Sequence, residues 1–175
     1  GTWSGEIWNK KKNGEVHPEW LKIFVVKDEN GNVSNFISLF ADVSESKNHA
    51  DQMHYMAYHD ALTGLPNRAK FNKIIRTAID DSIISGSMCV VAYLDLDSFK
   101  PVNDKFGHHL GDKLLKEVAK RINEGIRSHD TCSRIGGDEF VILLTQVYDD
   151  REAELVLARL CSNLSKPFQI DEIVV

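Results

Sequence analysis

The 175-residue sequence has only three cysteines and four prolines, and it lacks both a long apolar run and an excess of positive charge. The three cysteines are widely spaced within apolar segments, which indicates core residues in a reducing compartment and no disulfide framework. No stretch has the length of a membrane span or the pattern of a signal peptide, so we expect a cytoplasmic segment without membrane contact, any anchor lying outside it. A net charge of −5 without a basic stripe argues against a nucleic-acid partner. The cysteines are Cys89, Cys132 and Cys161.

An apolar content of 42% is enough for one large domain or two small ones. Residues 3–43 predict an antiparallel meander of three strands, because Asn13-Gly14 and Asn30-Gly31 are strong turn signals between apolar runs. Within the second strand, the alternation over residues 21–26 predicts a sheet with one well-buried face. Three strands alone bury little apolar surface, so this part is a truncated domain or needs a partner surface.

Residues 44–60 predict a linking helix, with Ser44 as its N-cap. Ala50, Met53 and Ala57 follow the three-and-four spacing of a coiled-coil seam. The pattern covers two heptads at most. A dimer seam and a short amphipathic helix packed on one domain both remain open.

Residues 61–175 alternate between helical and strand patterns, which predicts a ferredoxin-like α+β layer with helices on one face of an antiparallel sheet. We expect Ile79 and Ile83 of the first helix, and Leu155 of the last, to face the core. The expected elements are a helix after Pro66-Asn67, a strand at 88–95, a helix at 110–126, a hairpin at 131–145 and a helix at 150–164.

Acidic residues follow two of the apolar strands. The segment Gly136-Gly137-Asp138-Glu139 separates the apolar runs 131–135 and 140–144, which predicts a tight hairpin with carboxylates at its tip. The apolar run 88–94 ends in Asp95-Leu96-Asp97, where alternation puts both aspartates on one face if the strand extends that far. Magnesium prefers such oxygen ligands. The Gly-Gly string by itself also fits a solvated hairpin tip.

Four motifs in a fixed order make a stronger pattern than this string alone. They are Asp60–Arg68, Asp95–Lys100, Asn103–Asp112 and Arg134–Phe140. In these motifs the chain resembles the GGDEF family of diguanylate cyclases, which have a ferredoxin-like fold related to nucleotidyl cyclases and polymerase palms. The resemblance implies a homodimer that condenses two GTP molecules into cyclic di-GMP and pyrophosphate, with two Mg²⁺ or Mn²⁺ ions per active site.

The resemblance also implies roles for the acidic residues and the segment after them. Asp138 would ligate metal and accept the proton of the attacking hydroxyl. The loop Ser98-Phe99-Lys100 would approach the triphosphate, with Lys100 balancing charge in the transition state. Outside its motif, Lys100 would be read as an ordinary surface lysine. The implied metal ligands are Asp95, the Leu96 carbonyl, Asp138 and Glu139.

Further residues would bind the guanine base, and a separate pair would bind the product away from the catalytic centre. Guanine presents two N–H donors beside an oxygen acceptor, which Asp112 and Asn103 can read together, and His108 lines the same pocket by resemblance. Arg127 and Asp130 match the RxxD inhibitory site that binds cyclic di-GMP in this family. Without that offset from the Gly-Gly pair, an i,i+3 surface salt bridge would be the better reading.

The N-terminal part resembles the C-terminal half of a PAS sensor domain in the segments Trp3–Asn9, Glu19-Trp20 and Asp42–Lys47, with a generic meander as the alternative. The predicted domains are a PAS part at 1–43, a signalling helix at 44–60 and a GGDEF domain at 61–175.

The leading interpretation is a diguanylate cyclase under PAS control. The alternative is a silent GGDEF domain that binds GTP or cyclic di-GMP and regulates an attached phosphodiesterase domain. The last core strand of the family and its basic residues would lie beyond Val175. We therefore expect residues 1–175 alone to be weak or inactive, even if the full-length parent is active.

Overall fold

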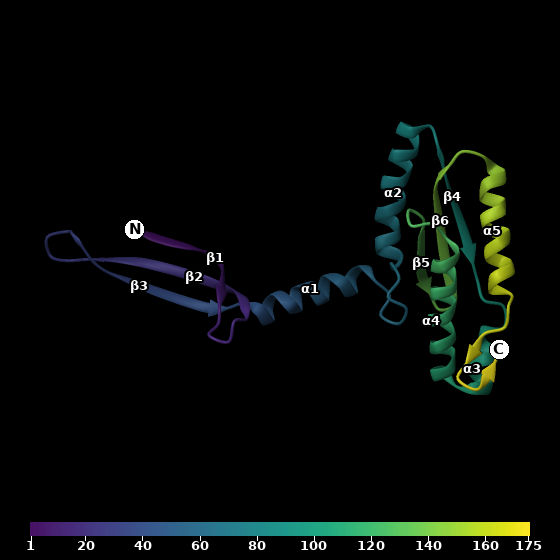
Figure 1. The fold of residues 1–175 in the computed structure, drawn as a ribbon, viewed down its shortest axis with the longest axis horizontal. Helices are drawn as coiled ribbons and strands as arrows, with labels where there is room; N and C mark the ends of the chain where they lie inside the picture. Colours follow the sequence, from purple (N-terminus) through teal and green to yellow (C-terminus); the bar gives the residue numbers. More distant parts are fainter. The chain divides into compact units, whose positions relative to one another are not determined.

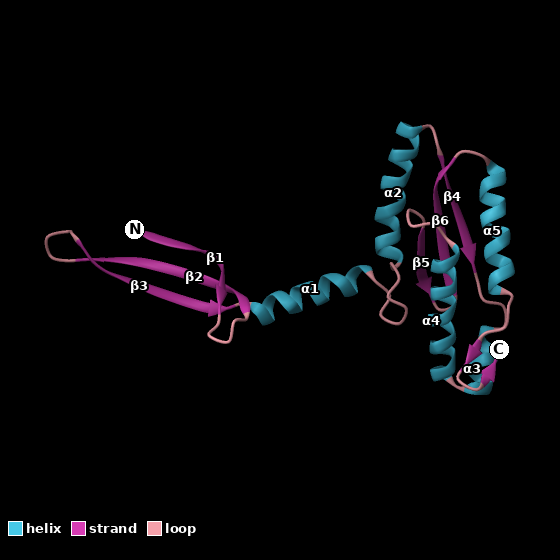
Figure 2. Cartoon of the chain, in the orientation of Figure 1, coloured by secondary structure: helices cyan, strands magenta, loops and turns pink.

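The structure is a computed structural model that describes residues 1–175, apart from the side chain of Ala50. The chain forms two compact units, residues 1–55 and 56–175, whose elements are shown in Figures 1 and 2. Helix α1, Ser44–Tyr58, begins in the first unit and ends in the second. Among the described residues, no helix combines the length and apolar character needed to span a membrane.

The first unit is the expected meander. Strands β1 (Thr2–Lys10), β2 (Val16–Lys27) and β3 (Val33–Asp42) pair antiparallel in the order β1-β2-β3. The turns contain Gly14 and Gly31 with φ of 92° and 82°, a conformation that glycine adopts without steric cost. Both Asn-Gly pairs were therefore correctly identified as turns.

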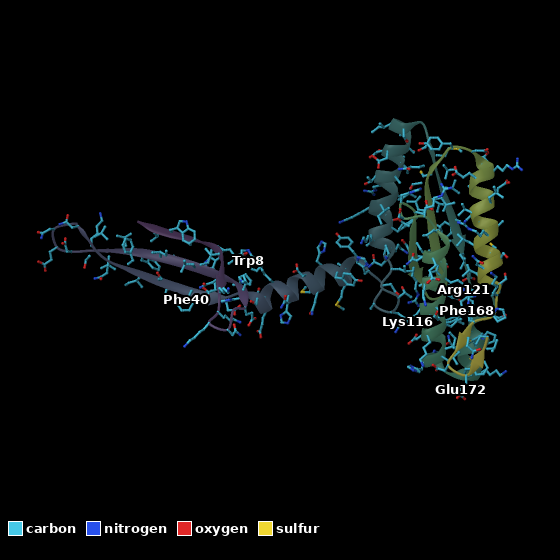
Figure 3. All side chains as sticks on the ribbon, in the orientation of Figure 1. Trp8, Phe40, Lys116, Arg121, Phe168 and Glu172 are labelled. Atoms are coloured by element: carbon cyan, nitrogen blue, oxygen red, sulfur yellow. The ribbon has the colours of Figure 1, made fainter. Side chains whose placement is uncertain are left out.

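The single well-buried face expected for this sheet is absent. Phe40 shares a face with Leu21, its partner in the register, whereas Trp8 projects from the opposite face. The two side chains, labelled in Figure 3, are 71% and 68% exposed. Both faces thus expose large apolar side chains, because no second layer packs over either one within the described residues of this unit. The buried residues of β2 include two polar ones, His17 and Glu19, and His17 Nε2 lies 2.8 Å from Glu19 Oε1.

The start of α1 differs from the prediction. Asp42, and not Ser44, supplies the capping oxygen, because its Oδ1 accepts the Ser44 backbone N–H at 2.9 Å. Hydrogen bonds from the Ser44 hydroxyl and backbone N–H hold the pKa of Asp42 below its ordinary value. Of the predicted seam, the Ala50 side chain lies outside the described residues and Met53 is exposed. The dimer seam therefore stays a prediction.

The second unit contains a three-stranded antiparallel sheet in the order β4-β6-β5, as a ferredoxin-like arrangement requires. Helix α3 corrects the sequence analysis, which expected a loop at 98–100, and the small β7–β8 hairpin lies in a segment to which that analysis assigned no element. The elements are α2 (Arg68–Ser85), β4 (Met88–Leu94), α3 (Phe99–Phe106), α4 (His108–Gly125), β5 (Thr131–Gly136), β6 (Glu139–Val147), α5 (Asp150–Leu164), β7 (Gln169–Ile170) and β8 (Ile173–Val174).

Helices cover both faces of this sheet, so the expectation of helices on one face was wrong. Along β6, Phe140, Ile142 and Leu144 belong to the larger core under α4 and α5. The alternate residues Val141 and Leu143 pack against Phe71 of α2 on the other face. Figure 1 shows α2 and α5 on opposite sides of the sheet. The strand period of two lets one central strand serve both cores.

Three predicted core residues are exposed. Only the part of α2 from Phe71 to Ala78 packs on the strands, which leaves Ile79 and Ile83 outside the core. On α5, Ala153, Val156 and Leu160 face inward, and Leu155 is 65% exposed. The apolar periodicity thus continued beyond the surface that each helix covers.

The cysteines differ from one another more than expected. Cys132 on β5 is buried, and this burial raises the pKa of its thiol to about 12. Cys89 is half-buried, whereas Cys161 on α5 is exposed, which corrects its assignment to the core.

Arg121 of α4 fixes the chain that follows α5. Its guanidinium donates hydrogen bonds to the carbonyl oxygens of Asn163, Lys166 and Pro167, and it stacks 3.5 Å from the centroid of the Phe168 ring. Figure 3 shows Arg121 and Phe168 beside each other. This contact holds the β7–β8 hairpin against the larger core, to which Phe168 belongs.

Candidate active site

The two acidic segments meet at one end of the β4–β6 pair. Leu94 is the cross-strand partner of Phe140, so Asp95 directly follows one member of this pair and Glu139 directly precedes the other. Because β4 ends at Leu94, the alternation expected for Asp95 and Asp97 does not apply, and Asp97 lies in the turn before α3. The antiparallel register, and not alternation, brings the two acidic segments together.

The hairpin tip is the expected tight turn. Gly136 pairs with Glu139, which leaves Gly137 and Asp138 as the connecting residues, and Gly137 has φ of 43°. Asp138 is half-buried, while Glu139 and Asp95 are exposed. This turn places the Asp138 carboxylate at the same sheet end as Asp95.

The carboxylates of Asp95, Asp138 and Glu139 are unengaged. In the described part of the chain, none of them has a hydrogen-bond or ion-pair partner, and no three acidic, His or Cys side chains converge closely enough to hold a metal ion. Their chemistry still fits a divalent cation such as Mg²⁺, which prefers carboxylate and carbonyl oxygens. The sheet end thus offers suitable donors that are not drawn together.

The turn after β4 contains two further residues with predicted roles. The Leu96 carbonyl accepts the Phe99 N–H at 3.3 Å, which uses one of its two lone pairs. Ser98 has φ of 64° and α3 begins at Phe99, so Phe99 and Lys100 lie in the first helical turn instead of a loop. Lys100 is exposed, with its ammonium group open to solvent.

The predicted guanine-reading pair lies where α3 and α4 meet. These helices contact each other and are joined at Gly107, which has φ of 84°. The Asn103 side chain lies against Gly111, where an added Cβ would collide with its Oδ1 atom. Since Gly111 precedes Asp112, the amide and this exposed carboxylate belong to neighbouring positions. His108, also exposed, begins α4 one turn earlier.

Arg134 is a residue of this site that the sequence analysis missed. Its Nε and Nη2 atoms donate to the Gly137 carbonyl at 2.9 and 2.6 Å, and its Nη1 donates to Asp60 Oδ1 at 2.9 Å. The same guanidinium therefore links the turn before Asp138 to the segment before α2. Asp60 and Arg134 both lie in motifs named in the sequence analysis. An acid in one motif and an arginine in another was the signal that could have indicated this ion pair.

Asp60 is the centre of a second small network. Besides Arg134, the Thr63 hydroxyl and backbone N–H donate to its Oδ1 at 2.6 and 2.9 Å. Partial burial alone would raise the pKa of Asp60, but these hydrogen bonds outweigh it and lower the pKa below its ordinary value. Asp60 is therefore ionised at neutral pH.

The predicted inhibitory pair has a different geometry from an i,i+3 salt bridge. The Asp130 carboxylate is only 2% exposed and accepts the backbone N–H groups of Arg127 and Thr145, each at 3.0 Å. The Arg127 guanidinium instead pairs with Glu152 of α5 at 2.7 Å. Asp130 thus shapes the turn, while Arg127 presents its charge at the surface.

A cavity of about 340 Å³ adjoins Arg127, between the end of α4 and the start of α5. It contains three arginines and two carboxylates, so its charge can favour an anion only in part. The arginines are Arg127, Arg151 and Arg159, and the carboxylates are Asp149 and Glu152.

Comparison with known proteins identifies the family. The family profile described as "Diguanylate cyclase, GGDEF domain" matches residues 57–175. The bifunctional diguanylate cyclase/cyclic di-GMP phosphodiesterase MucR of Pseudomonas aeruginosa is 44% identical over 115 residues, which are 66% of this chain and 17% of MucR. The chain spans 10% to 18% of the length of MucR and three further curated relatives.

Solved structures give the same result for the fold. The GGDEF domain of TpbB (YfiN) from Pseudomonas aeruginosa superposes with a TM-score of 0.64 at 34% identity, covering 67% of this chain and 69% of that chain. The coiled coil and GGDEF domain of DgcB from Caulobacter crescentus, in complex with c-di-GMP, gives a TM-score of 0.64 at 26% identity, covering 75% and 69%. The ferredoxin-like fold class is confirmed, and the chain belongs to the GGDEF family of diguanylate cyclase domains.

Proposed function

We propose that this chain is part of a diguanylate cyclase that condenses two GTP molecules into cyclic di-GMP and pyrophosphate, with a PAS domain as its control element. The meeting of the two acidic segments at the β4–β6 end carries the proposal, because phosphoryl transfer needs oxygen ligands for metal beside a proton acceptor. MucR, whose name includes this activity, supports the same reading.

In this proposal, the residues at the sheet end divide the chemical work. Asp95, the Leu96 carbonyl, Asp138 and Glu139 would hold two Mg²⁺ or Mn²⁺ ions, and these ions would neutralise phosphate charge and activate the hydroxyl. Asp138, half-buried beside the turn, accepts the hydroxyl proton. Lys100, exposed in the first turn of α3, balances charge on the triphosphate, which Phe99 approaches.

We assign guanine recognition to Asn103 and Asp112, with His108 lining the pocket. The contact between Asn103 and Gly111 supports this assignment, since it fixes the amide one residue from Asp112. An amide and a carboxylate can satisfy both donors and the acceptor of the guanine edge. A base that lacks these donors would leave the carboxylate unpaired.

The reaction joins two nucleotides, so each site must face the site of a second subunit. We therefore propose a homodimer as the active form, which the coiled coil in the DgcB structure and the spacing in α1 both favour. Arg127 and Asp130 form the inhibitory site for cyclic di-GMP. The DgcB complex shows that a related GGDEF domain binds this molecule.

A silent, regulatory GGDEF domain is the second candidate. The double name of MucR, a cyclase and a phosphodiesterase in one protein, favours it as a context for this chain. The retained Asp95, Asn103, Asp112, Asp138 and Glu139 favour an active enzyme instead, since each of these positions carries a residue that the chemistry needs.

The test compares the full-length parent with its Asp138→Ala and Glu117→Ala variants, supplied with GTP and Mg²⁺ or Mn²⁺. Chromatography should show cyclic di-GMP from the parent and from Glu117→Ala, which changes an exposed residue of α4. Asp138→Ala should form no product. Product formation by Asp138→Ala at the parent's rate contradicts the proposal, whereas GTP binding by the parent without any product identifies the silent domain.

A further inference from the structure

We propose that Glu152 sets the affinity of the inhibitory site, because its carboxylate holds the Arg127 guanidinium in the unliganded protein and competes with the phosphate of cyclic di-GMP. The inference rests on the proposed function, since it takes Arg127 as part of the product site. It adds a residue of α5, outside the RxxD motif, as a determinant of product inhibition.

The carboxylate that pairs with Arg127 is that of Glu152, and not that of Asp130. Asp130, the acid in its own motif, already accepts two backbone N–H groups and is nearly inaccessible. The Arg127 side chain is 42% exposed and its Nη2 lies 2.7 Å from Glu152 Oε1. A phosphate that approaches Arg127 from solvent therefore meets a guanidinium that is already occupied by an anion.

The charge of Glu152 persists at neutral pH. The hydrogen bond from Arg127, and then that from the Tyr148 backbone, hold the pKa of this carboxyl below its ordinary value. A phosphodiester in the adjoining cavity would be repelled by this carboxylate. Asp149, the other acid there, accepts the Arg151 backbone N–H as the N-cap of α5.

Capping of α5 accounts for only part of the Glu152 geometry. Its Oε2 accepts the Tyr148 N–H at 3.3 Å, as in a capping box that reaches back to the chain before the helix. That role leaves Oε1 free to pair with Arg127. Glutamine keeps an oxygen for the cap and removes the charge, so Glu152→Gln separates the two roles.

The experiment measures cyclic di-GMP binding to the purified chain by calorimetric titration, which needs no turnover. Glu152→Gln should bind about two- to fivefold more tightly than the unmodified chain, the range expected when a partly exposed ion pair is removed. Glu154→Gln, the same change at an exposed position of the same helix, should bind as the unmodified chain does. Arg127→Ala should lose most of the affinity.

A double variant tests whether the effect passes through Arg127. Arg127→Ala with Glu152→Gln should bind no better than Arg127→Ala alone, because the carboxylate then has no guanidinium to occupy. Equal tightening by Glu152→Gln and Glu154→Gln, or no tightening by Glu152→Gln, overturns the inference while the inhibitory site stands. Binding that Arg127→Ala leaves intact overturns the inhibitory site and the inference together.

Discussion

Among single residues, Arg134 connects the most distant parts of the candidate site. Its side chain is 12% exposed and donates to the Gly137 carbonyl and to Asp60, while its backbone N–H donates to the Pro66 carbonyl. Gly137 immediately precedes Asp138, so these hydrogen bonds fix the backbone from which the side chain of Asp138, the proposed base, projects. Arginine suits the position because its planar group serves two acceptors at once.

Replacement of Arg134 by lysine should therefore lower the free energy of unfolding by about 1.5–3 kcal/mol at pH 7, the range for lost hydrogen bonds to charged groups. Urea unfolding of the purified chain measures this difference. Arg76→Lys, an exposed position on α2, serves as the control and should change little.

The effect of Arg134→Lys on the free energy of unfolding should depend on pH. Because the folded-state pKa of Asp60 is lowered, its stabilising contribution is complete above the unfolded-state pKa of about 3.9 and disappears as the pH falls through the lower folded-state value. The stability difference between the unmodified chain and Arg134→Lys should therefore shrink below about pH 4. A stability difference that stays constant from pH 7 to pH 3 would mean that the hydrogen bond to Asp60 does not account for the stabilisation by Arg134.

At the scale of elements, the β7–β8 hairpin is held by burial in the larger core and by polar contacts from α4. Each of its strands has two residues, too few to be stable without support. Support comes from Arg121, through three carbonyl oxygens and the Phe168 ring, and from the ion pair of Lys113 with Asp171 at 2.7 Å. The ion pair is exposed and contributes little, so Arg121 is the main polar contact beside the burial of Phe168 and Ile170 in the larger core.

Arg121→Ala should loosen this hairpin while the β4-β6-β5 sheet stays folded. Hydrogen exchange of the Phe168 and Val175 amides, which bond to each other's carbonyls, should accelerate at least tenfold, since losing about 1.4 kcal/mol of local stability changes an opening equilibrium by that factor. The amides of β6 should keep their protection. The control is Lys120→Ala, an exposed neighbour on α4, and faster exchange in that variant would count against a specific role for Arg121.

The long elements were predictable because their patterns are local. The Asn-Gly turns, the inward face of α4 and the acidic hairpin all follow from turn chemistry or periodicity within a few residues. Helix α3 was missed because the resemblance assigned a loop to residues 98–100, and Pro101 is tolerated in the first turn of this helix. The β7–β8 strands are too short to show a period.

The site was predictable only where its residues share a motif. Asp95, Asp138 and the guanine-reading pair came from the motifs themselves. The partners Arg134 and Asp60 stand 74 residues apart, and a contact across that distance depends on how β5 packs beside the segment before α2. Nothing in the local pattern around Glu152 indicates that it pairs with Arg127.

For the molecule as a whole, the state of β4 decides how well the active site is held. Strand β4 is an edge of its sheet in the described structure, and Tyr93, near its end, is 75% exposed. Asp95 follows this edge, so the sheet positions it from one side only. In the proposed reaction, two such sites must also face each other.

Residues 1–175 alone should therefore form cyclic di-GMP at least about a hundredfold more slowly than the full-length parent, since a displacement of about 1 Å at a reacting group can cost that much. Chromatographic rates at matched concentrations of folded protein provide the measurement. Cyclic di-GMP binding by the isolated chain serves as the control for folding. Comparable rates would show that β4 needs no further support.

The buried thiol of Cys132 can report how often the sheet of the second unit opens. Only a thiolate reacts readily with alkylating or disulfide reagents, and burial with a pKa of about 12 keeps this sulfur both protonated and out of reach. Its modification must wait until β5 separates from its neighbours, whereas exposed Cys161 can react from the native state. The ratio of the Cys132 labelling rate to the Cys161 labelling rate therefore measures the fraction of molecules in which the sheet is open.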